Sequence, residues 1–269
     1  MTAVAHRIPD ADRRRGTARG GKDDGSGTAS VVKALQLLDL FRGGAASRGV
    51  TDLARQAGVP VSTAYRLLAY LVDGGFVVKE GTRYRPAEKL FELGNQVAHS
   101  RPQGLRERIA PHLGELYTVT GSTVRLGVLD GHDVVIVDKI VGLRTLPAPT
   151  AVGGRVPAAC SALGKAMLAF QPADLVADVL HRPLPRLTPR SLAAPQQLRR
   201  QLLQVLESRL AFDCEETVLG QVCVATPVMS DGAVVAAISL SSPTHRVDLK
   251  RAGTNLLQTA RRIELALRA

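Results

Sequence analysis

One stretch of about sixty residues constrains the fold of this chain more than any other feature. It holds three helical patterns in a row: an amphipathic segment that begins after Ser30, the short segment DLARQAG behind Thr51, and TAYRLLAYLVDGG behind Ser62. Each of these three hydroxyl residues is a good N-cap. Two short strands, at 76–79 and 83–85, follow as a hairpin around a glycine turn. This order predicts a winged helix-turn-helix over residues 30–86.

The third helix has two different faces. Ala64, Leu67 and Leu71 recur at helical spacing and should pack on the other two helices. The opposite face is polar, and its Arg66 can pair bidentately with guanine or with a phosphate. The hairpin adds basic residues that suit the DNA backbone. A generic three-helix bundle with a solvated polar face is the alternative. The residues expected to contact DNA are Thr51, Ser62, Thr63, Tyr65, Arg66, Lys79, Arg83 and Arg85.

The charge of the chain agrees with a polyanionic partner. Its 269 residues carry a formal net charge of +11, and residues 1–86 hold 14 Lys and Arg against 8 Asp and Glu. Such an excess favours nucleic acid or an anionic membrane surface. No apolar run is long enough to span a bilayer, and no hydrophobic segment opens the chain. Three widely spaced cysteines do not form a disulfide framework. We therefore expect a cytoplasmic protein with no membrane partner.

Two segments flank the winged helix. Residues 1–29 are rich in Gly, Arg, Asp and Ser without an apolar period, which predicts a disordered basic tail. Residues 87–102 predict a linker helix, with Leu90, Leu93 and Val97 on one stripe. That stripe is expected to pack on a partner subunit.

Residues 103–269 change pattern and predict an α+β domain around a mostly antiparallel sheet. Strand patterns at 122–130 and 134–141 are joined by a strong turn signal, and two more strands fall at 221–228 and 233–241. A helical segment that contains Pro111 should kink or restart there. The other helices are expected at 161–170, 173–180, 196–210 and 249–267.

Sequence strings in both parts carry a resemblance to a known family. The N-terminal part contains TDLARQAGVPVSTAYRLLAYLVDGGFV and RYRPAEKLFELG, and the C-terminal part contains ALGKAMLA and DCEETVLGQVCVATPV in that order. Together they resemble the IclR family of bacterial transcriptional regulators over essentially residues 30–269. The resemblance implies a winged helix, a linker helix and an effector-binding domain similar to the GAF fold. It also implies homodimers or homotetramers on palindromic double-stranded DNA operators.

The resemblance places the effector-binding residues at Ala162, Leu163, Asp213, Cys223, Ser239 and Ser241. The chain departs from the family pattern at Val61, where a basic residue is common, and at Cys214 and Gln221. From the residues alone, Cys223 fits a small core residue equally well. Ser239 and Ser241 share one strand face, and their hydroxyls need either a ligand or backbone and water partners.

Enzyme and metal chemistry find no support in the motifs. Gly164-Lys165 could belong to a phosphate-binding loop, but Ala159 stands where that loop needs its first glycine and Ala166 where it needs a hydroxyl. Neither G-x-G-x-x-G nor G-x-S-x-G occurs in the sequence. No C-x-x-C pair exists, and the histidines do not fall at metal-ligand spacing. We expect no catalytic residue, no metal and no cofactor.

The sequence thus predicts a ligand-responsive transcription factor, with repression favoured and activation by the same architecture left open. A non-specific DNA-coating protein and an enzyme are the alternatives from other classes. The scarcity of aromatic residues, 3% of the chain, favours a small organic acid as the effector over a large stacked ligand.

Overall fold

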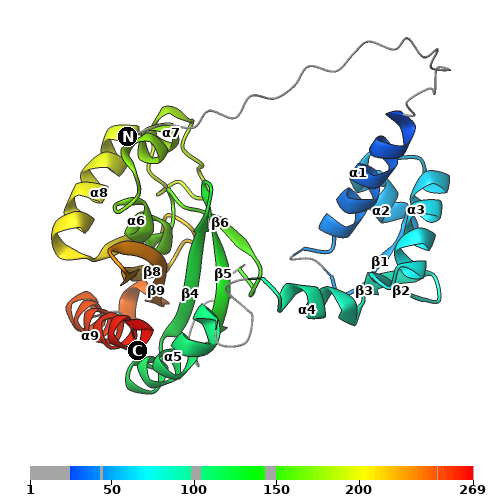
Figure 1. The fold of residues 1–269 in the computed structure, drawn as a ribbon. Coiled ribbons are helices and arrows are strands. Elements are labelled where there is room, and N and C mark those ends of the chain that lie inside the picture. The colour runs from blue at the N-terminus through cyan, green and yellow to red at the C-terminus, as the bar shows by residue number, and fades with distance from the viewer. Residues whose placement is uncertain (1–24, 43–44, 98–103, 143–149, 247, 269) are drawn as a thin grey trace, which may run out of the picture.

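A computed structural model describes residues 25–42, 45–97, 104–142, 150–246 and 248–268. Figure 1 shows a winged helix and a larger α+β part that follow one another along the chain, with the short helix α4 between them. Each part has a hydrophobic core of its own. No helix within the described ranges has the length and hydropathy that a bilayer crossing requires.

The winged helix-turn-helix is present as predicted. Leu37, Leu53 and Leu68 are fully buried at its centre, where α1, α2 and α3 pack together. A three-stranded antiparallel sheet in the order β1-β3-β2 forms the wing. The elements are α1 (Gly25–Asp39), β1 (Arg48–Gly49), α2 (Val50–Ala57), α3 (Val61–Asp73), β2 (Val77–Glu80), β3 (Arg83–Pro86) and α4 (Glu88–Gly94).

The predicted helix starts are wrong in this region. Helix α1 begins at Gly25, so Ser30 lies inside the helix and is not its N-cap. Residues 25–29, expected to belong to the disordered tail, are helical. Residues 1–24 lie outside the described ranges. Helices α2 and α3 begin after Gly49 and Pro60, so Thr51 and Ser62 occupy the first turn instead of the cap. Pro60 is the N-cap of α3, and a proline before the first helical turn costs no helical hydrogen bond because it has no N–H to donate.

The larger part is built on one six-stranded sheet. Its order is β6-β5-β4-β9-β8-β7, and every neighbouring pair is antiparallel. The short edge strands β6 and β7 were missed by the sequence patterns. The strands are β4 (Thr123–Asp130), β5 (Asp133–Ile140), β6 (Arg155–Pro157), β7 (Ala211–Cys214), β8 (Gln221–Ser230) and β9 (Ala233–Pro243).

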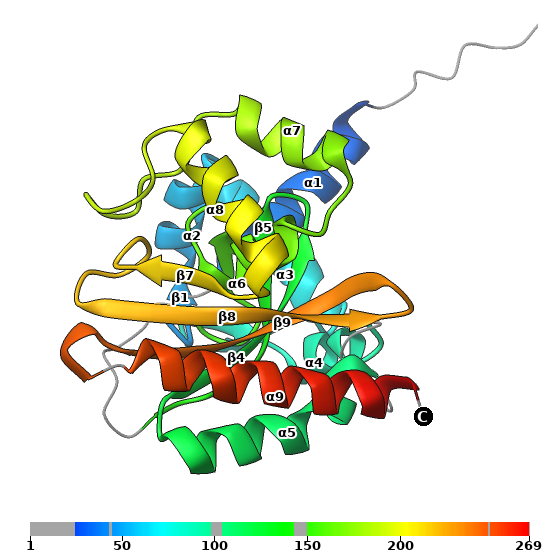
Figure 2. The same ribbon diagram turned by 90° about the vertical axis from the view of Figure 1, so that its left-hand side faces the viewer.

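Helices cover both faces of this sheet, as Figure 2 shows. On one face, α5 and α9 pack on a cluster that includes Leu126 and Ile238. On the other, α6 and α8 pack on a cluster that includes Ala225 and Ala237. Helix α5 continues through Pro111 without a restart. The helices are α5 (Leu105–Thr120), α6 (Ala162–Leu168), α7 (Ala173–His181), α8 (Pro195–Ser208) and α9 (Leu249–Arg268), with a 3-10 turn at Thr244–Arg246.

Candidate functional site

Helix α3 presents the polar face that the sequence predicted. Ala64 and Leu68 are fully buried, whereas Ser62, Tyr65 and Arg66 are exposed on the opposite side and Thr63 is half-buried. Among the described residues, no carboxylate lies within ion-pair distance of Arg66. Its guanidinium is therefore available to an external anion. Thr51, on α2, is exposed as well.

The basic residues of the wing have partners inside the chain. The Lys79 ammonium lies 5.2 Å from the centre of the Tyr65 ring, a cation–π distance. Arg83 donates from Nε to Ser47 Oγ at 2.8 Å. Arg85 donates to Glu80 Oε1 at 2.6 Å and to Glu88 Oε1 at 3.1 Å. A phosphate would have to compete with these two carboxylates for Arg85, which weakens the prediction that Arg85 contacts DNA.

The register of the large sheet gathers polar residues on the face that α6 covers. Arg125 of β4 lies opposite Ser239 of β9, and Cys223 of β8 lies between Ser241 and Asp213 on its two neighbours. Their sequence neighbours point to the α5 and α9 side, because side chains alternate along a strand. Strands distant in sequence thus bring five polar groups together.

Four of these five groups, all but Ser241, border a cavity of about 260 Å³ between the sheet and the start of α6. Five of the six residues predicted to bind effector line it: Ala162, Leu163, Asp213, Cys223 and Ser239. Ser241 lies just behind the wall, with its Oγ 2.6 Å from Cys223 Sγ. Ile136, Val156 and Leu187 supply apolar walls. The structure therefore brings the predicted effector-binding residues together. That they bind an effector remains a prediction.

Arg125 is a wall residue that the sequence reasoning missed. It is 5% exposed, and one of its terminal nitrogens donates to Ser241 Oγ. Among the described residues, neither its Nε nor the Oγ of the buried Ser239 has a hydrogen-bond partner. The signal was a charged residue at the centre of the otherwise apolar strand STVRLGVLD, since a buried charge needs a partner. Gln221, Thr217 and Arg155 also line the cavity.

Asp213 is held in place by the loop that follows it. Its Oδ1 accepts from the backbone N–H of Glu216 at 2.7 Å and its Oδ2 from the Thr217 hydroxyl at 2.5 Å. Burial raises the pKa of Asp213, and the hydrogen bond from Thr217 opposes that rise. The carboxylate thus fixes the loop that forms one wall of the cavity.

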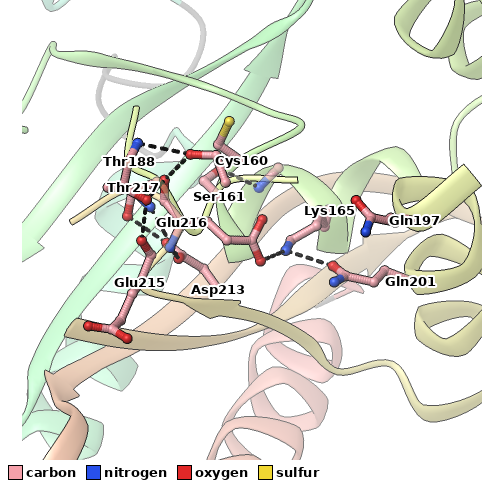
Figure 3. Close-up of polar contacts among 12 residues, drawn as sticks. Cys160, Ser161, Lys165, Thr188, Gln197, Gln201, Asp213, Glu215, Glu216 and Thr217 are labelled. Atoms are coloured by element: carbon pink, nitrogen blue, oxygen red, sulfur yellow. Dashed lines mark hydrogen bonds and ion pairs between the residues drawn. The ribbon is translucent and has the colours of Figure 1, made fainter. Parts of the chain in front are cut away.

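A buried ion pair supports the same loop from behind (Figure 3). Lys165 of α6 is fully buried and donates to Glu216 Oε1 at 2.6 Å and to Gln201 Oε1, on α8, at 2.8 Å. The Ser191 hydroxyl donates to the carbonyl of Glu216 at 2.7 Å. Burial raises the pKa of Glu216, and the Lys165 charge opposes that rise. The pair therefore links α6, α8 and the cavity wall.

Metal chemistry finds no donor set here. Among the described residues, no group of three or more His, Cys, Asp or Glu side chains is placed to hold a metal ion. Burial raises the pKa of the Cys160 thiol to about 11, so at neutral pH it is a protonated core residue and a poor nucleophile.

A winged helix-turn-helix whose third helix has an exposed polar face is the architecture of a DNA-binding transcriptional regulator. Comparison with known proteins agrees. The family model for the IclR helix-turn-helix domain matches residues 30–81, and the model for the C-terminal domain of bacterial IclR transcriptional regulators matches residues 97–265. The chain belongs to the IclR family.

Individual relatives extend this result. The Escherichia coli transcriptional regulator XynR is 37% identical over 223 residues, 81% of this chain and 88% of XynR. The Escherichia coli transcriptional repressor IclR is 32% identical over 88% of this chain and 89% of its own. An IclR homologue from Microbacterium hydrocarbonoxydans, solved in complex with 4-hydroxybenzoate, has a TM-score of 0.81 and 25% identity over 89% of this chain and 99% of its own.

Proposed function

We propose that this chain is a ligand-responsive repressor that binds palindromic operator DNA as a homodimer or homotetramer. The observation that carries the proposal is the exposed polar face of α3 with an unpaired Arg66. In a winged helix, the third helix enters the major groove and the wing follows the backbone. Ser62, Thr63, Tyr65 and Arg66 read the bases, and Arg83 contacts phosphate.

A second copy of the chain supplies the other half-site. Several large apolar residues of the N-terminal part are more than half exposed in one copy, among them Val31 and Leu35 on α1 and Phe91 on α4. Val31 and Leu35 are four residues apart on one face of α1, whereas the fully buried residue of this helix is Leu37. Exposed apolar surface of this kind favours a protein partner. Phe91→Glu should lower the mass measured by sedimentation and weaken operator binding together.

The effector is a compact organic acid held in the cavity between the sheet and α6. This class agrees with the polar groups of the wall, and a relative of the same fold was solved with 4-hydroxybenzoate. Effector binding alters the separation of the two winged helices. Because a palindrome is read only at a fixed half-site spacing, that change lowers operator affinity. The protein acts on DNA in the cytoplasm.

The Arg66→Ala variant tests the DNA-reading part of the proposal. Duplexes selected from a random pool by the wild-type protein serve as operators, with scrambled duplexes as controls, and fluorescence anisotropy measures affinity. A base contact predicts a loss of about 1–3 kcal/mol on the operator and relaxed preference at one position per half-site. A uniform loss on both duplexes assigns Arg66 to phosphate.

Other outcomes separate the rival functions. Equal wild-type affinity for selected and scrambled duplexes would instead support non-specific DNA coating. Activation of a reporter gene placed behind the selected operator would show that the protein is an activator of the same architecture and not a repressor. Unchanged affinity of Arg66→Ala on both duplexes would remove Arg66 from the interface.

A further inference from the structure

We propose that α3 reads thymine methyl groups through an apolar ridge formed by Val61 and Tyr65, and that Lys79 of the wing holds the Tyr65 ring in place. This inference deepens the proposed function and rests on it, because it takes α3 as the helix that enters the major groove. It adds an apolar contact to thymine to the polar contacts that Ser62 and Arg66 make.

The first support is the exposure of the ridge and its place on α3. Val61 is 47% exposed and Tyr65 is 53% exposed, whereas Leu67 and Leu68 of the same helix are buried in the core of the winged helix. Val61 and Tyr65 are four residues apart, so their side chains are neighbours on one face. Helix α3 begins at Val61, so the ridge occupies its first two turns. In a helix-turn-helix these are the turns whose side chains meet the base edges.

The second support is the chemistry around the ridge, which suits the major groove. Residues 61–70 of α3 contain no Asp or Glu, so no negative charge stands between this face and DNA. Ser62 and Arg66 are exposed one position further along than Val61 and Tyr65, so a polar row runs beside the apolar one. In the major groove, thymine presents a hydrogen-bond acceptor beside a methyl group that takes apolar contacts. Paired polar and apolar rows therefore match a groove that contains thymine.

The third support is the contact that holds Tyr65. The Lys79 ammonium lies 5.2 Å from the centre of the Tyr65 ring and 6.0 Å from the centre of the Tyr84 ring. Tyr84 is 2% exposed and is the direct partner of Lys79 in the β2–β3 register. A cation–π contact from this anchored lysine favours one position of an exposed ring that would otherwise rotate. In this proposal Lys79 is a positioning residue that acts on DNA through Tyr65.

The test replaces single thymines of the operator by deoxyuridine, which keeps the hydrogen-bonding groups of the base and lacks only the methyl group. The operators are duplexes selected from a random pool by the wild-type protein, and fluorescence anisotropy measures affinity. Burial of one methyl group corresponds to about a fourfold change in affinity. We expect one or two thymine positions per half-site to lose about fourfold, and the same replacement in both half-sites to lose roughly 16-fold.

Variants of the ridge show which side chain contacts each methyl group. Val61→Ser and Tyr65→Ser should each bind the thymine and deoxyuridine duplexes equally well at the position that the removed side chain contacts. Tyr65→Phe is the matched control, because it keeps the ring and loses only the hydroxyl, and it should keep the difference between the two duplexes. Tyr70→Ala removes an exposed tyrosine from the polar row and should keep it as well. All four variants should melt near the wild-type temperature, because the replaced side chains are exposed.

The positioning role of Lys79 has its own readout. Lys79→Met removes the charge and should reduce the difference between thymine and deoxyuridine at the Tyr65 position, whereas Lys79→Arg should retain it because arginine also makes cation–π contacts. If Lys79 instead contacts phosphate, Lys79→Met weakens binding to every duplex equally and leaves that difference unchanged. This second result would remove Lys79 from the proposal.

Three results would overturn the reading of methyl groups. They are an operator complex that is insensitive to every thymine methyl group, a sensitivity that survives in both serine variants, and serine variants that change the mass measured by sedimentation but not DNA binding. The last result would assign the ridge to a protein interface. A methyl-insensitive protein that still prefers selected to scrambled duplexes would keep the proposed function and lose the ridge, whereas equal affinity for both kinds of duplex would overturn both.

Discussion

At the scale of single residues, the stability of the fold should depend on the buried ion pair of Lys165 and Glu216 remaining intact. Removal of one member of a buried pair leaves an unpaired charge, which is more costly than the loss of the attraction itself. Lys165→Met should therefore lower the free energy of unfolding by about 3–5 kcal/mol. Lys165→Met combined with Glu216→Leu should recover most of that loss. Urea unfolding of both variants measures the difference, and equal losses would contradict the electrostatic origin.

The pH dependence of the single variant has a defined sign. Burial raises the pKa of Glu216 in the folded state above its unfolded value of 4.5, and the loss of Lys165 removes the charge that opposes the rise. The folded state then binds a proton more tightly than the unfolded state. The destabilisation of Lys165→Met should therefore shrink as the pH falls toward 4.5 and grow as the pH rises. Urea unfolding curves recorded at a series of pH values check this.

The three cysteines should differ in reactivity because they differ in exposure to solvent. Cys214 is exposed, whereas Cys160 and Cys223 are buried. Burial raises the pKa of all three thiols, that of Cys160 from 9.0 to about 11, so access of the reagent to the sulfur, and not the pKa, separates Cys214 from the other two. At pH 8, an aromatic disulfide reagent should titrate one thiol rapidly and the other two only after unfolding. Cys214→Ser should remove the fast phase; a fast phase that survives would contradict the burial of the other two.

The raised pKa of Cys160 also predicts alkaline destabilisation. The folded thiol stays protonated while the unfolded thiol ionises above pH 9.0, so its stabilising contribution is intact below pH 9.0 and is lost as the pH rises toward about 11. Cys160→Ala should show a smaller loss of stability across this range than the wild type. Thermal melts from pH 8 to pH 11 provide the comparison.

At the scale of elements, the placement of α6 depends on one glycine. A Cβ on Gly164 would lie 2.2 Å from the Cα and carbonyl oxygen of Ala158, and backbone atoms cannot give way as a flexible side chain would. Gly164→Ala should therefore destabilise the protein by about 3 kcal/mol or more. Because α6 carries Ala162 and Leu163 to the cavity, ligand-induced shifts in melting temperature should fall as well.

Gly114, in the middle of α5, is the matched control. In the part of the chain that the structure describes, a Cβ there meets no atom within 4 Å outside the helix's own backbone, so Gly114→Ala should stabilise the helix by about 0.5–1 kcal/mol through its lower backbone entropy. Thermal melts of the two variants should move in opposite directions. A similar loss in both would show that close packing at Ala158 is not the cause.

At the scale of the whole molecule, a dimer of winged helices should bind DNA with a steep dependence on salt. With about 6–10 phosphate contacts, affinity should fall roughly 10³–10⁵-fold between 50 and 200 mM salt. Arg83→Ala should flatten this dependence and leave sequence preference unchanged. Arg85→Ala should flatten it less, since Arg85 already pairs with Glu80 and Glu88. Anisotropy titrations at several salt concentrations measure both slopes, and a complex insensitive to salt would contradict the electrostatic contribution.

The sequence by itself determined the order of the elements and the architecture of both parts. Hydrophobic periodicity located most of the helices and the long strands, because burial of an apolar face fixes a period of about 3.6 or 2. It failed at helix starts and for the short edge strands β6 and β7. A start is decided by the backbone geometry of one or two residues, such as Pro60, and a strand of three or four residues is too short to show a period.

Only the tertiary structure decided which side chains share a site. Five of the predicted cavity residues came together as expected, whereas the pair of Lys165 and Glu216 carried no local pattern. The charge of Arg125 inside an apolar strand was a local signal, but it did not show which residues lie beside it. Arg125 and Ser239 lie more than one hundred residues apart and meet through strand register alone. The exposed Val31 and Leu35 fit the same helical period as a core stripe, so periodicity shows that a face is apolar but not what covers it. Pairing between distant strands and the choice of partner are properties of the whole fold.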